Sequence, residues 1–358
     1  MEDNLLTFRE QLIALEHYIK GIELEKQLLS IQDNNLLINN ESLLNFQKHQ
    51  ASFAAQKKRF DYNSIIVSLY GFFEQFIESM IRDYVKNLNI IIPEYKKLPP
   101  TIGKNHLDLS FKLISLVEQP RYQGNITTAE IISNLNTCLA QPNRYKLNEK
   151  AFAYHTANFR AGVITESFAR LGIENISRCI LNSTSFTTYL QTEYPDLDLE
   201  IIQQEEKGFY YLNDLAERRN EVAHGALPDA GIPSNDILLD YIKFFDAYSQ
   251  ALYEVLQNEV LHYKVKYQGI ELGKPVKVWL KGTVICISLK EITLKIGDLL
   301  VAKPVKKSLP YQAGKIKKIQ VKRKKYDEWL ASSQEEIICM QVNYKAKENQ
   351  TFFLIPNQ

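Results

Sequence analysis

The chain has 358 residues, 45% of them hydrophobic and 24% charged, which is ordinary for a globular protein long enough to bury two hydrophobic cores. No apolar run approaches the roughly 20 residues that span a bilayer. The first residues are acidic and amphipathic, so we expect neither a secretory signal nor an Arg-rich transit peptide. The net charge of +1 conceals an asymmetry, because residues 1–263 carry 24 basic and 34 acidic side chains whereas residues 264–358 carry 19 and 8. This division predicts two units with different partners.

The first predicted helix covers residues 4–29, where apolar side chains recur at spacings of three and four. A second covers residues 64–88 and is apolar on nearly every side, which is typical of a core helix. This helix has to end before Pro93, since proline cannot continue a helix. Residues 101–200 predict shorter helices separated by polar turns.

The next two predicted helices form a hairpin. The first covers residues 205–224 and is followed by Gly225, a residue type favoured just past a helix C-terminus. Ser234 or Asn235 can cap the second helix, whose apolar stripe is long enough for a core position. The segment RNEVAH, residues 219–224, therefore lies at the bend of the hairpin.

Near residue 267 the pattern changes to β-branched and aromatic runs of alternating polarity, separated by Gly, Pro, Asn and Ser. Five or six short strands at this spacing predict a small barrel or SH3-like unit. We therefore predict an α+β chain, with an all-α helical bundle over residues 1–262 followed by a small C-terminal β-barrel over residues 267–358.

The cysteines and the missing motifs exclude several classes of protein. Cys138, Cys179, Cys286 and Cys339 occur without a CxxC pair, which fits reduced, mostly buried thiols better than a disulfide framework or a zinc site. The sequence holds no GxxxxGK[ST], no GxGxxG after a strand and no GxSxG, so ATP, dinucleotide and serine hydrolase chemistry are unsupported. We expect a cytoplasmic protein with no metal, no cofactor and no contact with a membrane.

RNEVAH carries the groups that RNA cleavage without a metal requires. On a helix, Asn220 and His224 share one face, and Arg219 lies a little further round. Histidine titrates near neutral pH and can take the proton of a ribose 2′-hydroxyl. Arginine offers a planar fork that matches phosphate oxygens and keeps its charge, while Asn220 can orient either group. The expected products carry a 2′,3′-cyclic phosphate and a 5′-hydroxyl.

The same segment resembles the R-x4–6-H motif of the HEPN superfamily, in which a polar residue such as asparagine often follows the arginine. LYGFFEQFIESMI is similar to an early helix of that family, which carries an internal glutamate, here Glu74. HTANFRAGVITESFARLGI, residues 155–173, resembles the middle segment of the cyanobacterial-type, defence-associated branch. The resemblance covers roughly residues 50–262. It implies a symmetric homodimer in which two copies of the motif face one cleft.

The function that we predict is a metal-independent endoribonuclease. His224 is the expected general acid or base, Arg219 the phosphate clamp and Asn220 the orienting residue. The supporting candidates are Arg218, Glu74 and Glu221. The resemblance also implies a role in bacterial defence or a toxin-like system, with RNA as the substrate and an antitoxin or defence-system protein as a further partner. The sequence leaves open which of Arg218 and Arg219 faces the cleft.

Several of these residues can also be explained by a purely structural role instead of a catalytic one. His224 can be a cation favoured by the macrodipole at a helix C-terminus, and Arg218 and Arg219 can pair with neighbouring glutamates. Glu74 can pair with either arginine across the bundle. His155, which forms the reverse pattern H-x4-R, is expected on a surface helix.

Residues 264–325 hold 17 basic side chains against three acidic ones. Because the lysines surround strand-like segments, the pattern predicts a folded basic face that follows phosphate backbones rather than a disordered arm. The candidate nucleic-acid-binding residues are Lys315, Lys317, Lys318, Lys322, Arg323, Lys324 and Lys325. The alternative is an ordinary β domain whose lysines serve solubility.

The order and spacing of the predicted strands are similar to those of the second, barrel-forming domain of translational GTPases. The segments that carry this resemblance are LKIGDLLVAKP, AGKIKKIQVKRK and EEIICMQVNYKAKENQTFFLI. This resemblance implies a barrel that contacts RNA or the ribosome. The competing function is therefore a catalytically silent scaffold that dimerises through the helical bundle and holds nucleic acid on the basic barrel.

Overall fold

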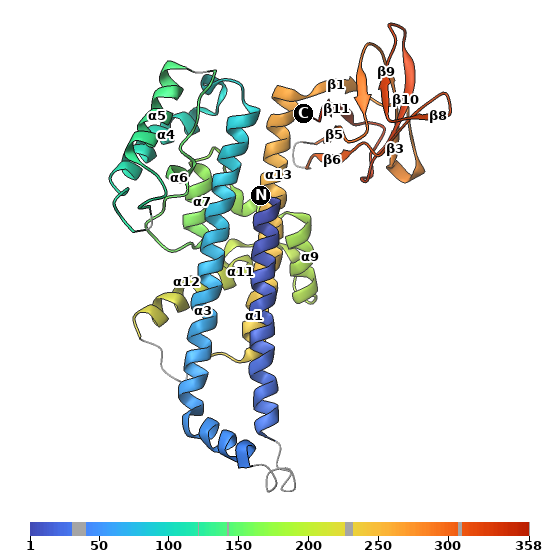
Figure 1. Cartoon of the computed structure of the whole chain (residues 1–358). Helices are drawn as coiled ribbons and strands as arrows, with labels where there is room; N and C mark the ends of the chain where they lie inside the picture. Colours follow the sequence, from blue (N-terminus) through green and yellow to red (C-terminus); the bar gives the residue numbers. More distant parts are fainter. Residues whose placement is uncertain (31–40, 121, 142, 226–231, 307–309, 358) are drawn as a thin grey trace. The chain divides into compact units, whose positions relative to one another are not determined.

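The computed structural model describes residues 1–30, 41–120, 122–141, 143–225, 232–306 and 310–357 (Figure 1). The chain divides into two compact units. Unit 1 consists of Met1–Lys86 and Leu98–Val255, and unit 2 consists of Asn87–Lys97 and Leu256–Gln358. Two of the three boundaries fall inside long helices, Glu41–Ile91 and Asn235–Gln268, so both helices contribute residues to each unit.

Three long helices form the frame of unit 1, namely α1 (Glu2–Leu29), α3 (Glu41–Ile91) and α13 (Asn235–Gln268). They lie side by side (Figure 1). Phe8 of α1 stacks on Phe76 of α3 with ring centroids 4.7 Å apart, and Phe73 of α3 meets Phe245 of α13 at 4.8 Å. Each ring is buried, and burying a side chain of this size contributes about 1.5–3 kcal/mol.

The helix predicted over residues 4–29 is confirmed, but the second predicted helix is longer than its apolar pattern. α3 begins at Glu41 instead of residue 64, has a kink at Phe53 (φ −130°) and ends at Ile91, before Pro93. Its first turns are largely exposed and therefore lack the apolar periodicity that a core helix shows. Among the described helices, α3 is the one long and apolar enough to cross a membrane, and 50% of that stretch is buried inside the protein.

Shorter helices fill the rest of unit 1, as the polar turns predicted. They are α4 (Pro100–Ile114), α5 (Thr128–Ala140), α6 (Glu149–Phe152), α7 (Ala161–Ala169), α8 (Ile176–Leu181), α9 (Thr184–Glu193), α10 (Leu199–Ile202), α11 (Glu205–Gly208) and α12 (Tyr210–Ala223). The single helix predicted over residues 205–224 is wrong, because the chain there is divided at Phe209 into α11 and α12. α12 and α13 are the arms of the predicted hairpin. The loop residues 226–231 between them lie outside the described residues.

Unit 2 contains eleven described strands. They are β1 (Ile270–Gly273), β2 (Lys277–Trp279), β3 (Val284–Leu289), β4 (Thr293–Lys295), β5 (Leu299–Lys303), β6 (Gln312–Lys315), β7 (Lys318–Val321), β8 (Lys324–Tyr326), β9 (Glu328–Leu330), β10 (Glu336–Gln341) and β11 (Thr351–Ile355). Unit 2 also includes two short 3₁₀ turns, η1 (Tyr95–Lys97) and η3 (Leu280–Gly282).

The predicted closed barrel is not found among the described strands. They form a four-stranded sheet of order β1-β11-β5-β6, a five-stranded sheet of order β2-β3-β10-β7-β8 and a separate pair β4-β9, all antiparallel. The two larger sheets share one apolar core that includes Ile285, Leu300, Ile338 and Phe352. Alternating polarity marks which face of a strand is buried but not which strands are neighbours, so it could not distinguish a barrel from packed sheets.

The expectation that all four cysteines carry reduced thiols is wrong for one pair. β3 and β10 pair so that Cys286 lies directly opposite Cys339, and a disulfide joins them. Cys138, which is buried, and Cys179, which is exposed, are not part of a disulfide. The two bonded cysteines are 53 residues apart, and only the register of the strands brings them together. The cysteine pattern therefore no longer supports a reducing compartment.

Candidate active site

The RNEVAH segment forms the last turn of α12. Leu212, Leu215 and Ala216 bury one side of this helix, and Asn220 and Arg219 are half-buried at its edge. The helix ends at Ala223, and His224 is the capping residue, with φ −92° and ψ 0°. Gly225 follows with φ +67°, the left-handed conformation predicted for a glycine just past a helix end.

Arg218 is held in a polar network on the inner side of α12. Its Nε donates to Asp214 Oδ2 at 2.6 Å and to the Tyr241 hydroxyl at 2.9 Å, and Nη1 donates to the Tyr62 hydroxyl at 3.3 Å. Tyr241 also donates to Asp214. Burial acts to lower the pKa of Arg218, but the hydrogen bonds with Tyr62 and Asp214 outweigh it and the pKa is raised. Arg218 thus ties α12 to α3 and α13.

Arg219 has a different environment. Its guanidinium carbon lies 5.4 Å from the centre of the Tyr70 ring of α3, a cation–π arrangement. The Tyr70 hydroxyl accepts a hydrogen bond from the backbone N–H of Phe159 at 2.9 Å. Burial raises the pKa of Tyr70 to about 12, so the hydroxyl stays neutral near pH 7. A neutral aromatic face supports the cation while its hydrogen-bond donors can still take up phosphate oxygens.

The segment of residues 153–160 lies between α3 and α12 and fixes Asn220. The side-chain amide of Asn158 donates to Asn220 Oδ1 at 2.5 Å. Arg160 forms an ion pair with Glu217 at 3.3 Å, and the backbone N–H of Ala161 donates to Asn213 at 3.0 Å. Since its oxygen is engaged by Asn158, the amide nitrogen of Asn220 is the atom left to orient a ligand.

His224 and Glu221 are exposed at the end of α12. The backbone N–H of His224 donates to the Asn220 carbonyl at 3.0 Å, so the residue completes the last helical turn while it remains exposed. The structure therefore brings Arg219 and Asn220 together at a platform made by α3 and residues 153–160. His224 is exposed at the C-terminus of the same helix, and Arg218 is directed into the bundle.

A second group of polar side chains occupies the same face of α3. Glu74 and Glu78 are one turn apart, and His155 reaches both from the segment 153–160. The prediction that His155 lies on a surface helix is wrong, because the residue is in a loop and its side chain is only 7% exposed. Sequence analysis also missed Tyr70, Asn158 and Glu78. Only the spacing of Glu74 and Glu78, four residues apart on an apolar helix, was available as a signal.

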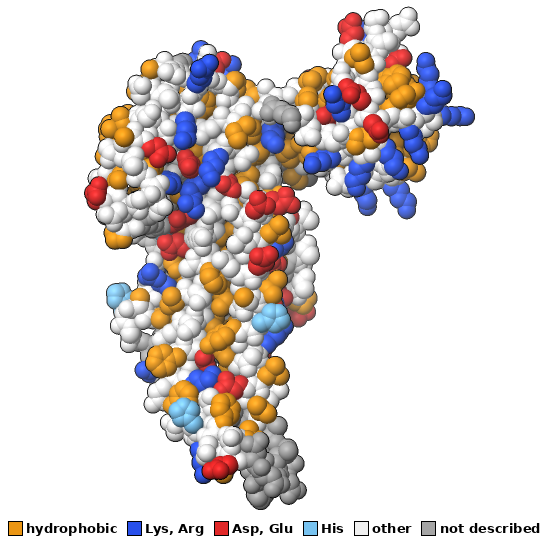
Figure 2. Space-filling model, viewed as in Figure 1, with side chains coloured by type: hydrophobic (Ala, Val, Ile, Leu, Met, Phe, Trp, Pro, Cys, Tyr) orange, Lys and Arg blue, Asp and Glu red, His pale blue; other side chains and the backbone are white. Residues whose placement is uncertain are grey.

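The predicted nucleic-acid-binding residues of unit 2 are all exposed and occupy β6, β7, β8 and the turns beside them. Lysine and arginine side chains gather over this unit in Figure 2. Lys322 and Arg323 form the two-residue turn between β7 and β8 and have φ values of +48° and +69°. These values are typical of the type I′ turn that matches the twist of a hairpin.

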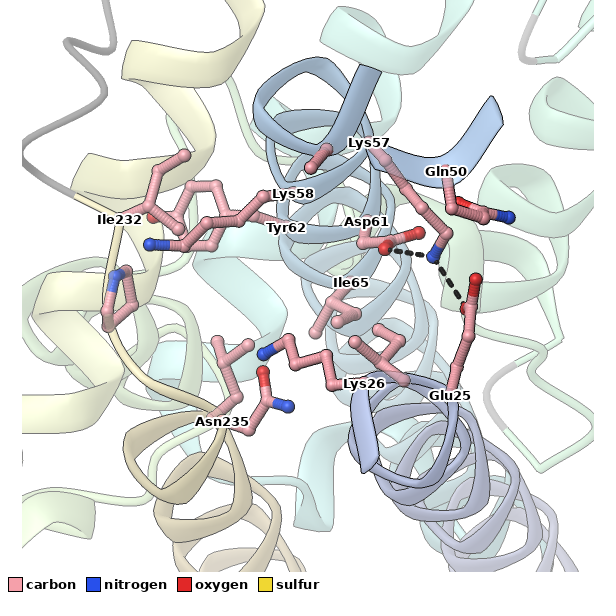
Figure 3. A pocket seen from close by; sticks show the side chains of 14 residues that line it. Glu25, Lys26, Gln50, Lys57, Lys58, Asp61, Tyr62, Ile65, Ile232 and Asn235 are labelled. Carbon is pink, nitrogen blue, oxygen red and sulfur yellow. Dashed lines mark hydrogen bonds and ion pairs between the residues drawn. The ribbon is translucent and has the colours of Figure 1, made fainter. Parts of the chain in front are cut away.

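A separate pocket of about 120 Å³ lies among α1, α3 and the first turn of α13 (Figure 3). Within it Lys57 forms ion pairs with Glu25 at 3.0 Å and Asp61 at 2.8 Å. Arg219, Asn220 and His224 do not line this pocket. Tyr62 lines it and is also an acceptor for Arg218, so the pocket lies behind the anchored side of α12.

Comparison with known proteins gives one result for the helical part of the chain. A family model described as RiboL-PSP-HEPN matches residues 14–258, more than half of the chain. No curated protein matches the sequence. The matched residues include α3, the segment 153–160 and α12, the three elements that build the candidate site.

Proposed function

Because the chain belongs to the RiboL-PSP-HEPN family, we propose that it is a metal-independent endoribonuclease whose reacting groups come from the RNEVAH segment. HEPN domains are often ribonucleases, and membership supports a nuclease or RNA-related function. The family match does not cover residues 259–358, so the proposal concerns the helical part of the chain.

The observation that carries the proposal is the different placement of two adjacent arginines. Arg218 is committed to Asp214, Tyr62 and Tyr241 and serves the fold. Arg219 lies on the Tyr70 ring beside Asn220, where a phosphate can reach it. A helix end that served only as a charged terminus would not require one arginine to be held on an aromatic platform.

The chemistry follows from these positions. His224 takes the proton of a ribose 2′-hydroxyl, the 2′-oxygen attacks the adjacent phosphorus, and the bond from phosphorus to the 5′-oxygen breaks. A second imidazole returns a proton to the leaving 5′-oxygen, which yields a 2′,3′-cyclic phosphate and a 5′-hydroxyl. Arg219 donates to the phosphate oxygens as negative charge builds up on them. Asn220, oriented by Asn158, positions the phosphate or the imidazole.

The second imidazole comes from the His224 of another copy in a symmetric dimer. One α12 supplies a single histidine to the proposed site, whereas transfer of a proton to the leaving group needs a group that is already protonated. A two-fold axis near the two α12 ends brings two copies of Arg219, Asn220 and His224 to one cleft. We propose that the enzyme acts on RNA in the cytoplasm, in bacterial defence or as a toxin, although the Cys286–Cys339 disulfide does not favour a reducing compartment. An antitoxin or defence-system partner is expected, because uncontrolled cleavage of RNA would harm the cell that makes the enzyme.

The second candidate function is a catalytically silent scaffold that binds nucleic acid through unit 2. The exposed Lys315, Lys317, Lys318, Lys322, Arg323, Lys324 and Lys325 favour it. A surface of this charge gives salt-dependent binding with little sequence preference. The two functions are compatible in one chain, since the basic residues lie outside the family match.

The deciding experiment incubates purified protein with total RNA and with tRNA in EDTA. Wild type, His224→Ala and Arg219→Ala are compared, with His17→Ala as a matched control because His17 is an exposed histidine on α1. Cleavage by wild type and His17→Ala alone, with 2′,3′-cyclic phosphate ends, is the expected result. If all four proteins bind RNA but none cleaves it, the result would favour the scaffold function. Undiminished cleavage by His224→Ala would refute the proposed role of the histidine.

A further inference from the structure

Three metal-ligating atoms converge beside the candidate active site. One carboxylate oxygen each of Glu74 and Glu78 and a ring nitrogen of His155 all lie within 4.8 Å of one another. His155 Nε2 is 3.5 Å from Glu74 Oε1 and 3.1 Å from Glu78 Oε1. Ligands about 2.1 Å from one ion are separated by roughly 3.0–3.5 Å in tetrahedral or octahedral geometry. The two distances from His155 Nε2 fall in this range, and the two carboxylate oxygens lie within 4.8 Å of each other.

A second observation concerns the other ring nitrogen. His155 Nδ1 lies 2.9 Å from the carbonyl oxygen of Ala157, an atom that only accepts hydrogen bonds. The proton of a neutral ring is therefore on Nδ1, and Nε2 presents its lone pair toward Glu74 and Glu78. Metal-binding histidines ordinarily make this hydrogen bond, which fixes both the tautomer and the ring orientation. The ring also packs on Phe159 with centroids 4.1 Å apart, which restricts its movement.

The charges of the cluster match a divalent ion. Two carboxylate groups, 26% and 16% exposed, both lie close to Nε2 of His155. Like charges at this distance repel in a half-buried site unless a cation lies between them. A doubly charged cation can be bound by both carboxylates and the imidazole nitrogen together.

We propose that Glu74, Glu78 and His155 bind a divalent transition-metal ion of the zinc or manganese class. An imidazole nitrogen with two carboxylate oxygens suits these ions, whereas magnesium and calcium favour oxygen ligands alone. The ion joins α3 to the segment 153–160, which carries Asn158 and contacts Tyr70. The metal site shares Glu74 with the supporting candidates of the ribonuclease site but contains neither Arg219 nor His224, so the test variants change only Glu78 and His155.

The test measures binding of zinc and manganese to the full chain after treatment with a chelator, by isothermal titration calorimetry, with magnesium for comparison. The test variants are Glu78→Gln and His155→Gln. The matched controls are Glu10→Gln and His17→Gln, which change exposed residues of α1. His224→Ala tests binding at the exposed histidine of α12. We expect one zinc or manganese ion per chain, affinity at least about tenfold weaker in both test variants, and unchanged affinity in the other three.

Thermal unfolding provides the second readout. Bound metal stabilises the folded chain by mass action, so zinc is expected to raise the Tm of wild type and of the controls but not of the test variants. Circular dichroism in chelator shows whether each variant is folded, and Glu78→Gln keeps the shape of the side chain if His155→Gln does not fold. No uptake by wild type, or equal uptake by both folded test variants, would overturn the site. Cleavage of RNA in EDTA is read separately, so either proposal can fail alone.

Discussion

Arg218 and Arg219 are neighbours in the sequence, but the structure gives them different tasks. Replacing Arg218 by Ala leaves Asp214 half-buried without its main cation, so we expect the free energy of unfolding to fall by about 2 kcal/mol. Replacing Arg219 by Ala removes one cation–π contact and is expected to cost less than about 1 kcal/mol. The same change is expected to lower kcat/KM for RNA cleavage about 100- to 1000-fold, because a phosphate donor is lost.

The two variants are compared by urea denaturation and by cleavage rate at matched folded fraction. Each arginine is the control for the other, since both changes remove one positive charge from the same turn of α12. Equal losses of stability would contradict the division of tasks. Full activity of Arg219→Ala would do so as well.

His106 lies in the core of unit 1 and couples stability to pH. Its Nε2 accepts a hydrogen bond from the Asn148 N–H at 2.9 Å, and burial lowers its pKa from 6.5 to about 4. The unfolded chain therefore binds a proton that the folded chain excludes. The contribution is fully present above about pH 6.5 and is lost as pH falls toward 4, which gives a loss of about 2 kcal/mol between pH 7 and pH 5.

The measurement compares denaturation of wild type and His106→Gln at several pH values between 4.5 and 7.5. Glutamine keeps an acceptor for Asn148 but does not titrate. The difference in unfolding free energy between the two proteins should shrink as the pH falls. His17→Gln, at an exposed position, should follow wild type throughout; a pH-independent difference between wild type and His106→Gln would refute the assignment.

At the scale of helices, periodicity predicted α1, the core part of α3 and the hairpin of α12 and α13. Each has an apolar stripe that meets the bundle, and Gly225 marks the end of α12 as expected. The partners of the site were not predictable in the same way. His155 lies in a loop, and its contact with Glu78 joins residues 77 apart, which no local pattern encodes.

At the scale of strands, the sequence predicted five or six strands, whereas the described residues form eleven, because several predicted runs are divided between two strands. The sequence also did not predict how the strands pair. Cys286 and Cys339 illustrate the difference, because each reads as a buried strand residue until β3 and β10 are placed in register. The prediction of a closed barrel was wrong for the same reason. Strand order depends on contacts between distant segments, and alternation reports only which side of each strand is buried.

The β7–β8 hairpin supports a prediction about stability. Its turn residues Lys322 and Arg323 both have positive φ, a conformation that favours asparagine and glycine. We expect the double change Lys322→Asn and Arg323→Gly to raise the free energy of unfolding of unit 2 by about 1 kcal/mol, since left-handed backbone costs other residues about that amount.

Urea denaturation of the full chain, followed by the fluorescence of Trp279 and Trp329, reports on unit 2 because both tryptophans of the chain lie there. The control is Lys324→Asn with Lys325→Gly, which removes the same number of charges from the adjacent strand β8 and should destabilise. If the turn change also weakens RNA binding, the two lost charges contribute to the basic face. A fall in stability for the turn change would show that the side chains outweigh the backbone effect.

At the scale of the whole molecule, the two units differ in charge, because the excess of basic side chains in residues 264–358 belongs to unit 2. Unit 1 holds most of the family match and the candidate active site, whereas the basic residues that we propose for nucleic-acid binding lie in unit 2. Nothing in the family match speaks to the role of unit 2. We propose that unit 1 cleaves RNA and that unit 2 binds its phosphate backbone. The salt dependence of RNA binding is then expected to arise from unit 2.

The last prediction concerns the number of chains that one active site needs. If each cleft contains two copies of RNEVAH, activity per chain is constant while the chain concentration is above the dissociation constant of the dimer. At chain concentrations well below that constant, activity per chain falls in proportion to the concentration. Cleavage rates are measured over dilutions from micromolar to nanomolar chain, with the oligomeric state followed by analytical ultracentrifugation under the same conditions. Excess His224→Ala chain, mixed in and allowed to exchange, should further reduce the activity of wild type, because mixed dimers contain one imidazole where proton removal and proton return need two. Activity per chain that persists in the monomer, and is indifferent to the added variant, would show that one α12 is sufficient.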